Sequence, residues 1–139
     1  MNFDQYTIKA QEVIQKALQI AQSNQQQAVE TGHVLQAILQ EDVNTSTFLM
    51  NKLNVNQVAL TQALEAIVKG YPKVSGGQTF MGTDLTNALN KSQTYLKEFG
   101  DEFVSIELML LGVLSGKDAV PKLMKDAGFK EKELKEAIK

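Results

Sequence analysis

The feature of this sequence that most constrains its fold is an internal duplication of a helix-forming stretch. Residues Glu30–Leu39 read ETGHVLQAIL, and residues Val104–Val113 read VSIELMLLGV. A shift of 74 positions (30 to 104) lays the first stretch on the second, and the match continues downstream without a gap. Upstream, a shift of 71 positions (14 to 85) lays Ile14 on Leu85. A repeat this long that occurs only twice predicts a duplicated half-domain, not an open solenoid.

Helical periodicity runs through both copies and predicts four helices in each. Along the first helix, apolar residues recur at three- and four-residue steps, at Val13, Ile14, Ala17, Leu18 and Ala21. The expected helices start near residues 4, 31, 45, 56, 83, 105, 118 and 130. No segment shows the alternation of a strand. We therefore expect an all-α fold of eight helices, arranged as two four-helix repeats related by pseudo-two-fold symmetry.

A segment with glycine and proline separates the two copies. Pro72 and the pair Gly76–Gly77 do not fit a helix interior. We therefore expect repeat one at 4–68, a linker at 69–82 and repeat two at 83–139. A chain of 139 residues is long enough to bury one core, so the repeats are expected to form a single domain.

Composition excludes several classes of function. The chain has no cysteine, which excludes disulfides, zinc–thiolate sites and cysteine catalysis. Its net charge is −2, and it has no arginine, the residue whose planar fork recognises phosphates and guanine edges. We therefore expect no nucleic-acid partner. No apolar run is long enough to cross a membrane and no signal peptide is evident, so a cytoplasmic protein without membrane contact is expected.

Individual residues give no catalytic or metal site. His33 is the only histidine and has neither a nucleophile nor a second ligand beside it, so we expect a structural hydrogen-bonding role. The segment Gly112–Asp118 superficially suggests a phosphate-binding loop, but its glycine spacing and the residue after its lysine do not fit that motif. Asp101, Glu102 and Glu107 form an acidic cluster, which favourable interaction with a helix N-terminus explains without a metal.

The order of short motifs along the chain resembles the N-terminal domain of the Clp ATPases. The paired motifs are Thr31–Leu35 and Ser105–Met109, one at the start of the second helix of each copy. Three further motifs resemble the ClpB branch, the protein disaggregases: Phe3–Thr7, Tyr71–Val74 and Gly100–Ser105. The resemblance covers essentially the whole chain.

Two positions separate the ClpB branch from the ClpC branch. Relatives of the ClpC branch carry a glutamate just before the helix-opening histidine of each repeat, and use it to hold phosphorylated arginine. In this chain the corresponding residues are Gly32 and Ile106. The resemblance to ClpB is therefore favoured, and a phosphoarginine site is not expected.

The resemblance implies a substrate-recognition domain with no catalytic activity and no cofactor of its own. Such a domain binds exposed apolar segments of unfolded or aggregated proteins. The full-length protein would use ATP and magnesium, act with the DnaK chaperone system and form hexamers, whereas the domain alone is expected to be monomeric. Three alternatives remain: an adaptor-docking domain as in ClpA and ClpC, a structural cap regulating an attached ATPase, and a small hydrolase, for which no nucleophile and base can be assembled.

Five substrate-binding residues are implied by the same resemblance. They are Thr7, Tyr95, Asp101, Glu107 and Leu108. The three polar residues match positions important for chaperone action, and Thr7 is expected inside the first helix. Tyr95 and Leu108 match positions of an apolar groove beside the fifth and sixth helices. A further groove position is occupied by Lys91, which suggests a narrower or charge-flanked groove.

Overall fold

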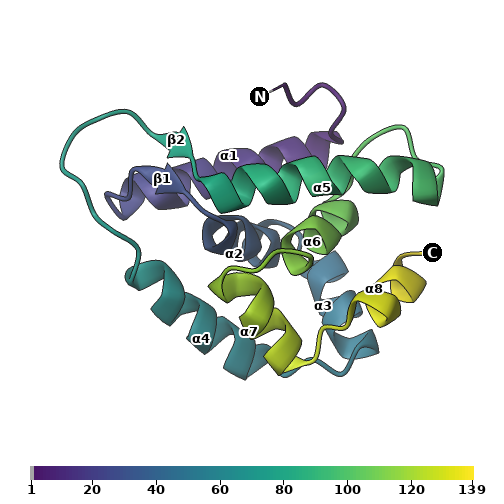
Figure 1. Ribbon diagram of the computed structural model, residues 1–139. Helices are drawn as coiled ribbons and strands as arrows, with labels where there is room; N and C mark the ends of the chain where they lie inside the picture. The colour runs from purple at the N-terminus through teal and green to yellow at the C-terminus, as the bar shows by residue number, and fades with distance from the viewer. Residues whose placement is uncertain (1) are drawn as a thin grey trace.

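The computed structural model describes residues 2–139 as eight helices and two very short strands (Figure 1). The helices are α1 (Ile8–Ser23), α2 (Thr31–Glu41), α3 (Val43–Lys52), α4 (Gln57–Lys69), α5 (Thr83–Phe99), α6 (Ile106–Leu114), α7 (Ala119–Ala127) and α8 (Glu131–Ile138). The strands β1 (Ala28–Val29) and β2 (Phe80–Met81) pair in parallel. The helical architecture confirms the all-α prediction, while the two-residue strands were not predicted.

Helices α2 and α6 form the centre of the molecule. Every residue of α6 is buried except Glu107, and α2 buries Thr31–Leu35 together with Ala37 and Ile38. A helix that is apolar on all sides must be covered on all sides. The other six helices provide this cover: α1, α3 and α4 pack on α2, and α5, α7 and α8 pack on α6.

A close crossing joins α5 to α6. A Cβ atom added at Gly112 would lie 2.3 Å from the Ala88 carbonyl oxygen and 2.3 Å from Ser92 Oγ. Any larger residue at position 112 would therefore push the two helices apart. The Ser92 hydroxyl donates to the Ala88 carbonyl at 2.9 Å, so its polar group is satisfied although fully buried.

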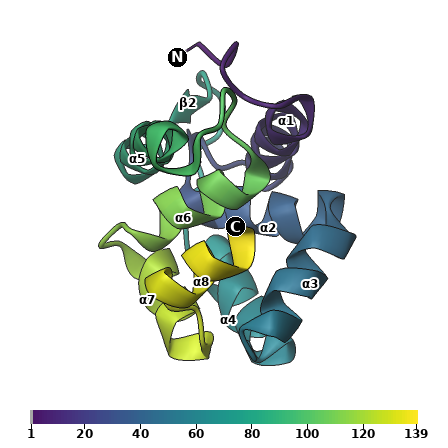
Figure 2. The same cartoon turned by 90° about the vertical axis from the view of Figure 1, so that its right-hand side faces the viewer.

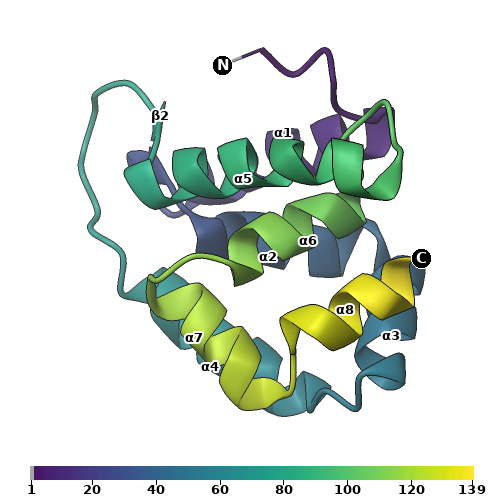
Figure 3. The same cartoon turned by 45° about the vertical axis from the view of Figure 1, so that its right-hand side comes forward.

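The helix contacts of one half recur in the other, as the predicted pseudo-two-fold arrangement requires. Contact of α1 with α2 matches α5 with α6, and contact of α2 with α3 and α4 matches α6 with α7 and α8. Between the halves, α4 packs on α7 as α3 packs on α8, and α1 touches α6 as α5 touches α2 (Figure 3). The arrangement of two four-helix sets is confirmed, and the expected limits of 4–68 and 83–139 for superposable repeats stay a prediction.

The helix caps correct the register expected for the first two helices of each half. The N-caps of α1 and α5 are Thr7 and Gly82, which are 75 positions apart (7 to 82). The N-caps of α2 and α6 are Glu30 and Ser105, also 75 apart (30 to 105). The upstream shift of 71 is therefore wrong. The pairings of Thr31 with Ser105 and of Gly32 with Ile106 are wrong as well, because matching by residue type placed two cap-like hydroxyl residues together. With a shift of 75, Gly32 corresponds to Glu107 (32 to 107).

The N-caps of α3 and α7, Asp42 and Asp118, are 76 positions apart (42 to 118), but the ends of these helices and the helices that follow them have the expected shift of 74. Asn54 and Gly128, which end the turns after α3 and α7, both have positive φ and are 74 positions apart (54 to 128). The N-caps Asn56 and Lys130 of α4 and α8 have the same spacing (56 to 130). The duplication is therefore not gapless, because the shift changes from 75 at the start of the second helix to 74 at the end of the third.

The start of α1 also differs from the expectation. Residues 4–6 were predicted to be helical, but α1 begins at Ile8 and Thr7 is its N-cap, with Oγ1 accepting from the Ala10 N–H at 3.1 Å. Tyr6 is buried and bridges to Val104 instead. Thr7 is thus not a mid-helix threonine, and its side chain has a local structural role.

Replacing a leucine at the centre of either repeat should destabilise the domain strongly. Leu35 of α2 and Leu110 of α6 are almost fully buried, so Leu35→Ala and Leu110→Ala should each lower the free energy of unfolding by about 2–5 kcal/mol. The exposed Val58 provides a control, since Val58→Ala should change it by less than about 0.5 kcal/mol. Urea unfolding measures all three. Wild-type stability in both leucine variants would show that these leucines do not fill the core.

Candidate functional site

The three polar residues implied by the resemblance lie around one end of the molecule. The Thr7 N–H donates to the Val104 carbonyl at 2.9 Å, which holds the start of α1 against the connection from α5 to α6. Asp101 is in this connection and Glu107 is in the first turn of α6. Figure 2 shows the N-terminal segment running beside the α5–α6 connection. The fold therefore brings these three parts of the chain to the same edge.

The acidic residues at this edge are available to solvent. Asp101 follows Gly100, which ends α5 in the left-handed conformation, and Asp101 is exposed. Ser105, not an acidic residue, caps α6 by accepting from the Leu108 N–H at 3.2 Å. Glu107 is partly exposed in the first turn, where its charge interacts favourably with the helix dipole. Because Ser105 provides the N-cap of α6, neither the Asp101 nor the Glu107 carboxylate is needed to cap this helix.

Two exposed apolar residues lie at the same edge, and the sequence reasoning missed both. Ile8, the first residue of α1, is 76% exposed, and Phe103 is 49% exposed. Each is adjacent in sequence to one of the two residues, Thr7 and Val104, whose backbones are hydrogen-bonded. The sequence does contain a signal for the exposure of Ile8, because this residue lies outside the helical stripe of buried residues in α1, which are Ala10, Val13, Ile14, Ala17 and Ala21.

The structure contradicts the predicted exposure of Tyr95 and Leu108. Leu108 is 0% exposed inside the first turn of α6, and Tyr95 is 3% exposed. Both belong to the core, because the second half buries α6 on all sides and α8 packs over it. Neither side chain is exposed for contact with a partner in this conformation.

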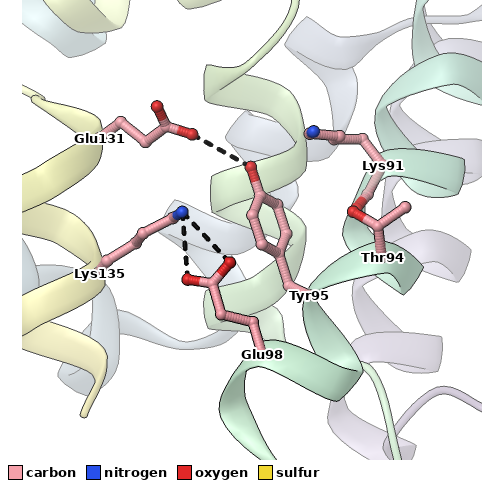
Figure 4. A network of polar contacts seen from close by, with 6 residues as sticks. All are labelled: Lys91, Thr94, Tyr95, Glu98, Glu131 and Lys135. Atoms are coloured by element: carbon pink, nitrogen blue, oxygen red, sulfur yellow. Dashed lines mark hydrogen bonds and ion pairs between the residues drawn. The ribbon is translucent and has the colours of Figure 1, made fainter.

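Tyr95 is held by a network between α5 and α8 (Figure 4). Its hydroxyl donates to Glu131 Oε1 at 3.2 Å, and the Nζ atoms of Lys91 and Lys135 lie 5.5 and 5.2 Å from the ring centroid. Lys135 also pairs with Glu98 at 3.1 Å. Burial, followed by the nearby Glu131 carboxylate, raises the pKa of Tyr95 to about 12. The ring is therefore a neutral hydrogen-bond donor that docks α8.

His33 has the structural role predicted from its isolation in the sequence. Its Nδ1 accepts from the Glu30 N–H at 2.9 Å, while the Glu30 carboxylate accepts from the His33 N–H, which closes a capping box. His33 Nε2 lies 2.6 Å from Gln26 Oε1, and because Nδ1 is an acceptor, Nε2 carries the proton. Burial lowers the pKa of His33 to about 4, so the ring is neutral at pH 7.

The remaining candidate features are structural. Gly112–Asp118 covers the end of α6, its C-cap Ser115 and the N-cap of α7, as predicted. Among residues 2–139, no three His, Cys, Asp or Glu side chains are grouped so that they could hold a metal ion.

Comparison with known proteins identifies the family. The profile described as "Clp repeat (R) N-terminal domain" matches residues 5–136. The chain belongs to this family. Its similar relatives include the chaperone protein ClpB of Bacteroides thetaiotaomicron, 41% identical over 138 residues, and that of Porphyromonas gingivalis, 31% identical over 138 residues. Each match covers 99% of this chain and 16% of the relative, so the chain spans about a sixth of the length of these ClpB proteins.

Solved Clp N-terminal domains share the fold. The Hsp104 N-terminal domain from Candida albicans superposes with a TM-score of 0.80 and 16% identity, over 96% of this chain and 89% of that one. The N-terminal domain of ClpD from Arabidopsis thaliana superposes with a TM-score of 0.72 and 18% identity, over 99% of this chain and 94% of that one. The recognition of a Clp N-terminal domain most like that of ClpB is therefore confirmed. Across residues 2–139, no helix has the length and apolar character needed to cross a membrane.

The buried histidine should make the stability of this Clp domain depend on pH. The unfolded chain protonates His33 near pH 6.5 but the folded domain only near pH 4, so its stabilisation is complete above pH 6.5 and is lost as the pH falls towards 4. At about 1.4 kcal/mol per pKa unit, this amounts to about 3 kcal/mol. Urea unfolding of wild type and His33→Gln between pH 7 and 4 measures it, and the wild type should lose more stability.

The comparison of wild type with His33→Gln also accounts for the titration of the neighbouring Glu30 carboxylate. Burial raises the pKa of Glu30, which stabilises the fold at lower pH and so opposes the histidine effect. Glu30 is present in both proteins, so the difference between their pH profiles isolates His33. Parallel profiles would contradict the assignment of a neutral, buried histidine.

Proposed function

We propose that this Clp domain recognises exposed apolar segments of unfolded or aggregated proteins for a ClpB-type disaggregase. The observation that carries the proposal is the exposure of Ile8 and Phe103 at the edge where Thr7, Asp101 and Glu107 also lie. We call these five residues the N-terminal edge. Exposed apolar side chains with a polar margin are typical of protein-interaction sites.

The chemistry of this edge suits a client that has lost its fold. Misfolded proteins share exposed apolar side chains, and Ile8 and Phe103 offer apolar contacts to them. Apart from Ile8, the hollow of about 380 Å³ that Ile8 lines along α1 is lined by polar residues, so it offers no second apolar side chain that would select one sequence. Thr7, Asp101 and Glu107 offer hydrogen-bond acceptors to an extended backbone, whose N–H groups are unpaired. The edge therefore fits broad recognition.

In the full-length protein, the domain would present clients to attached ATPase modules. We infer that those modules, which use ATP and magnesium, supply the catalysis, that the protein forms hexamers and acts with the DnaK chaperone system, and that the domain itself needs no cofactor. The similarity to ClpB over this part of the chain supports these inferences. Recognition by a separate domain must be reversible, because a bound client has to be released from the domain and passed to the central pore of the proposed hexamer.

The expected affinity follows from the small size of the edge. Two apolar side chains gain little after the costs of association and of ordering a flexible segment. Dissociation constants of about 10 μM to 1 mM are expected, which correspond to about −7 to −4 kcal/mol. Since apolar contacts dominate, the affinity should depend only modestly on ionic strength.

The test is a titration of the isotope-labelled domain with a reduced, alkylated protein that stays unfolded. Amide shifts should concentrate at residues 7, 8 and 101–107. The double variant Ile8→Ser, Phe103→Ser should bind at least about tenfold more weakly, a loss of about 1.4 kcal/mol. Both side chains are exposed, so the variant should remain folded.

A matched control replaces an exposed apolar residue elsewhere. Val58 of α4 is 68% exposed, close to the 76% of Ile8, and lies outside the N-terminal edge, so Val58→Ser should bind like wild type. Thr7→Asn, which keeps a capping side chain at the start of α1 but removes the hydroxyl, separates a binding role for this hydroxyl from its structural role. Shifts confined to residues 25–30 or the far ends of α4 and α8, or unchanged affinity in the double variant, would contradict the proposal.

A further inference from the structure

The two halves of the domain differ at one pair of equivalent positions in a way that points to a second binding site. With the register given by the caps, Ile20 of α1 corresponds to Tyr95 of α5 (20 to 95, a shift of 75). One turn later, Asn24 corresponds to Phe99. The first half thus has a smaller aliphatic side chain and an amide where the second half has two aromatic rings.

In the second half, Tyr95 fills the space between three helices. Its ring stacks edge-on against Phe99 with centroids 6.5 Å apart, and Lys135 of α8 lies over the ring (Figure 4). Its hydroxyl reaches Glu131 at the start of α8 and lies near Ser115 at the end of α6. An aromatic residue thus occupies the junction of α5, α6 and α8.

In the first half, the equivalent junction of α1, α2 and α4 is an open groove of about 510 Å³. Its floor is apolar and its rim is polar. The floor consists of Ile20, Leu39, Leu64 and Val68. The rim consists of Asn24, Gln36, Gln40, Thr61, Glu65 and Lys69. The volume falls within the range of about 300–1,000 Å³ that is typical of ligand sites.

Two further residues that line the groove match residues beside Tyr95. Gln40 corresponds to Ser115 (a shift of 75), and Thr61 corresponds to Lys135 (a shift of 74). Both residues of the first half line the groove, and both residues of the second half approach Tyr95. The open groove is therefore the place that a tyrosine occupies in the other half of the same molecule.

We propose that the groove between α1, α2 and α4 binds a tyrosine side chain presented by a partner protein. The ring would rest on Ile20 and Leu39, which are only partly buried and whose remaining apolar surface would leave water. The hydroxyl would bond to the amides of Gln36 or Gln40, which both donate and accept.

The charges at the rim favour a neutral ligand. Glu65 and Lys69 pair with each other at 3.1 Å, so the rim has no net charge to attract or repel an ion. A phenol suits this combination of apolar floor and neutral polar rim better than lysine, which has no apolar ring, or leucine, which has no polar group. The groove is lined by none of the residues of the N-terminal edge, so the proposal is independent of that site.

The test uses a blocked pentapeptide, Gly-Ser-Tyr-Ser-Gly, and analogues with phenylalanine, leucine or lysine at the centre. Titration of the isotope-labelled domain should shift the backbone amides of Ile20 and Leu39 and the side-chain amides of Gln36 and Gln40. The tyrosine peptide should bind at least threefold more tightly than the phenylalanine peptide and at least tenfold more tightly than the others.

A variant with a tyrosine at position 20 tests the equivalence of Ile20 with Tyr95, from which the proposal starts. Ile20→Tyr should fill the groove from within, as Tyr95 does in the second half, and weaken peptide binding at least tenfold without lowering the melting temperature. Gln62→Tyr adds the same side chain on the exposed face of α4 and should bind the peptide like wild type. If Ile20→Tyr does not fold, Thr61→Phe at the exposed rim blocks the groove instead, with the same expected loss.

Three results would overturn the proposal. They are equal binding of all four peptides, shifts away from α1, α2 and α4, and wild-type affinity in a folded Ile20→Tyr or Thr61→Phe variant. The N-terminal edge is judged separately, because Ile20→Tyr should leave the titration with unfolded protein unchanged at Ile8 and Phe103. Loss of one binding activity therefore does not imply loss of the other.

Discussion

The burial of α6 is the constraint on which the rest of the structure depends. Its sequence, IELMLLGVL, offers solvent only one polar side chain, Glu107, and that residue is in the first turn. Such a helix gains stability only when other helices enclose it, and its burial on every side is the main hydrophobic gain available to the second half. Gly112 makes the enclosure tight by letting α5 approach the backbone of α6 directly.

The same constraint explains where apolar residues remain exposed. The segments that lead into α1 and α6 are tied by the Thr7–Val104 hydrogen bond, which fixes the first turn of α1 at the edge of the core. Tyr6 turns inward from this tie and is buried, whereas Ile8 points away from the buried stripe of α1. A second backbone hydrogen bond, from the Val104 N–H to the Gln5 carbonyl at 2.7 Å, strengthens this tie. Burial of Tyr6 and exposure of Ile8 therefore follow from one short stretch of backbone pairing.

The sequence predicted the helices well because periodicity and caps are local properties. The expected starts near residues 56 and 105 are confirmed, since Asn56 and Ser105 are the N-caps of α4 and α6. Some starts are wrong by a few residues, since α1 begins at Ile8 and α3 at Val43, where starts near residues 4 and 45 were expected. The other errors concern contacts between distant segments. The pairing of β1 with β2 involves two residues on each side, too few for any pattern, and the burial of Tyr95 depends on α8, which lies more than 30 residues further along the chain.

The residues of the candidate site were also only partly predictable, because their exposure depends on contacts between distant segments. Thr7, Asp101 and Glu107 were inferred from a resemblance, and the fold brings their segments to one edge. The apolar side chains beside them could not be inferred in this way, because exposure is decided by which helices cover a position. Tyr95 matched a groove residue of relatives but is covered by α8 in this structure.

Each half of the duplication closes a surface that the other half leaves open. At the start of α2, the Gly32 N–H donates to the Tyr71 hydroxyl of the linker, and a Cβ at Gly32 would lie 2.6 Å from that oxygen. The equivalent residue at the start of α6 is Glu107, whose side chain excludes such a contact and keeps its carboxylate partly exposed. At the other pair of surfaces the second half is the closed one, because Tyr95 fills its junction of helices, whereas the equivalent junction at Ile20 in the first half is the open groove. Two copies of one backbone thus yield two different exposed surfaces, because substitutions at equivalent positions decide which copy of each surface is filled from within.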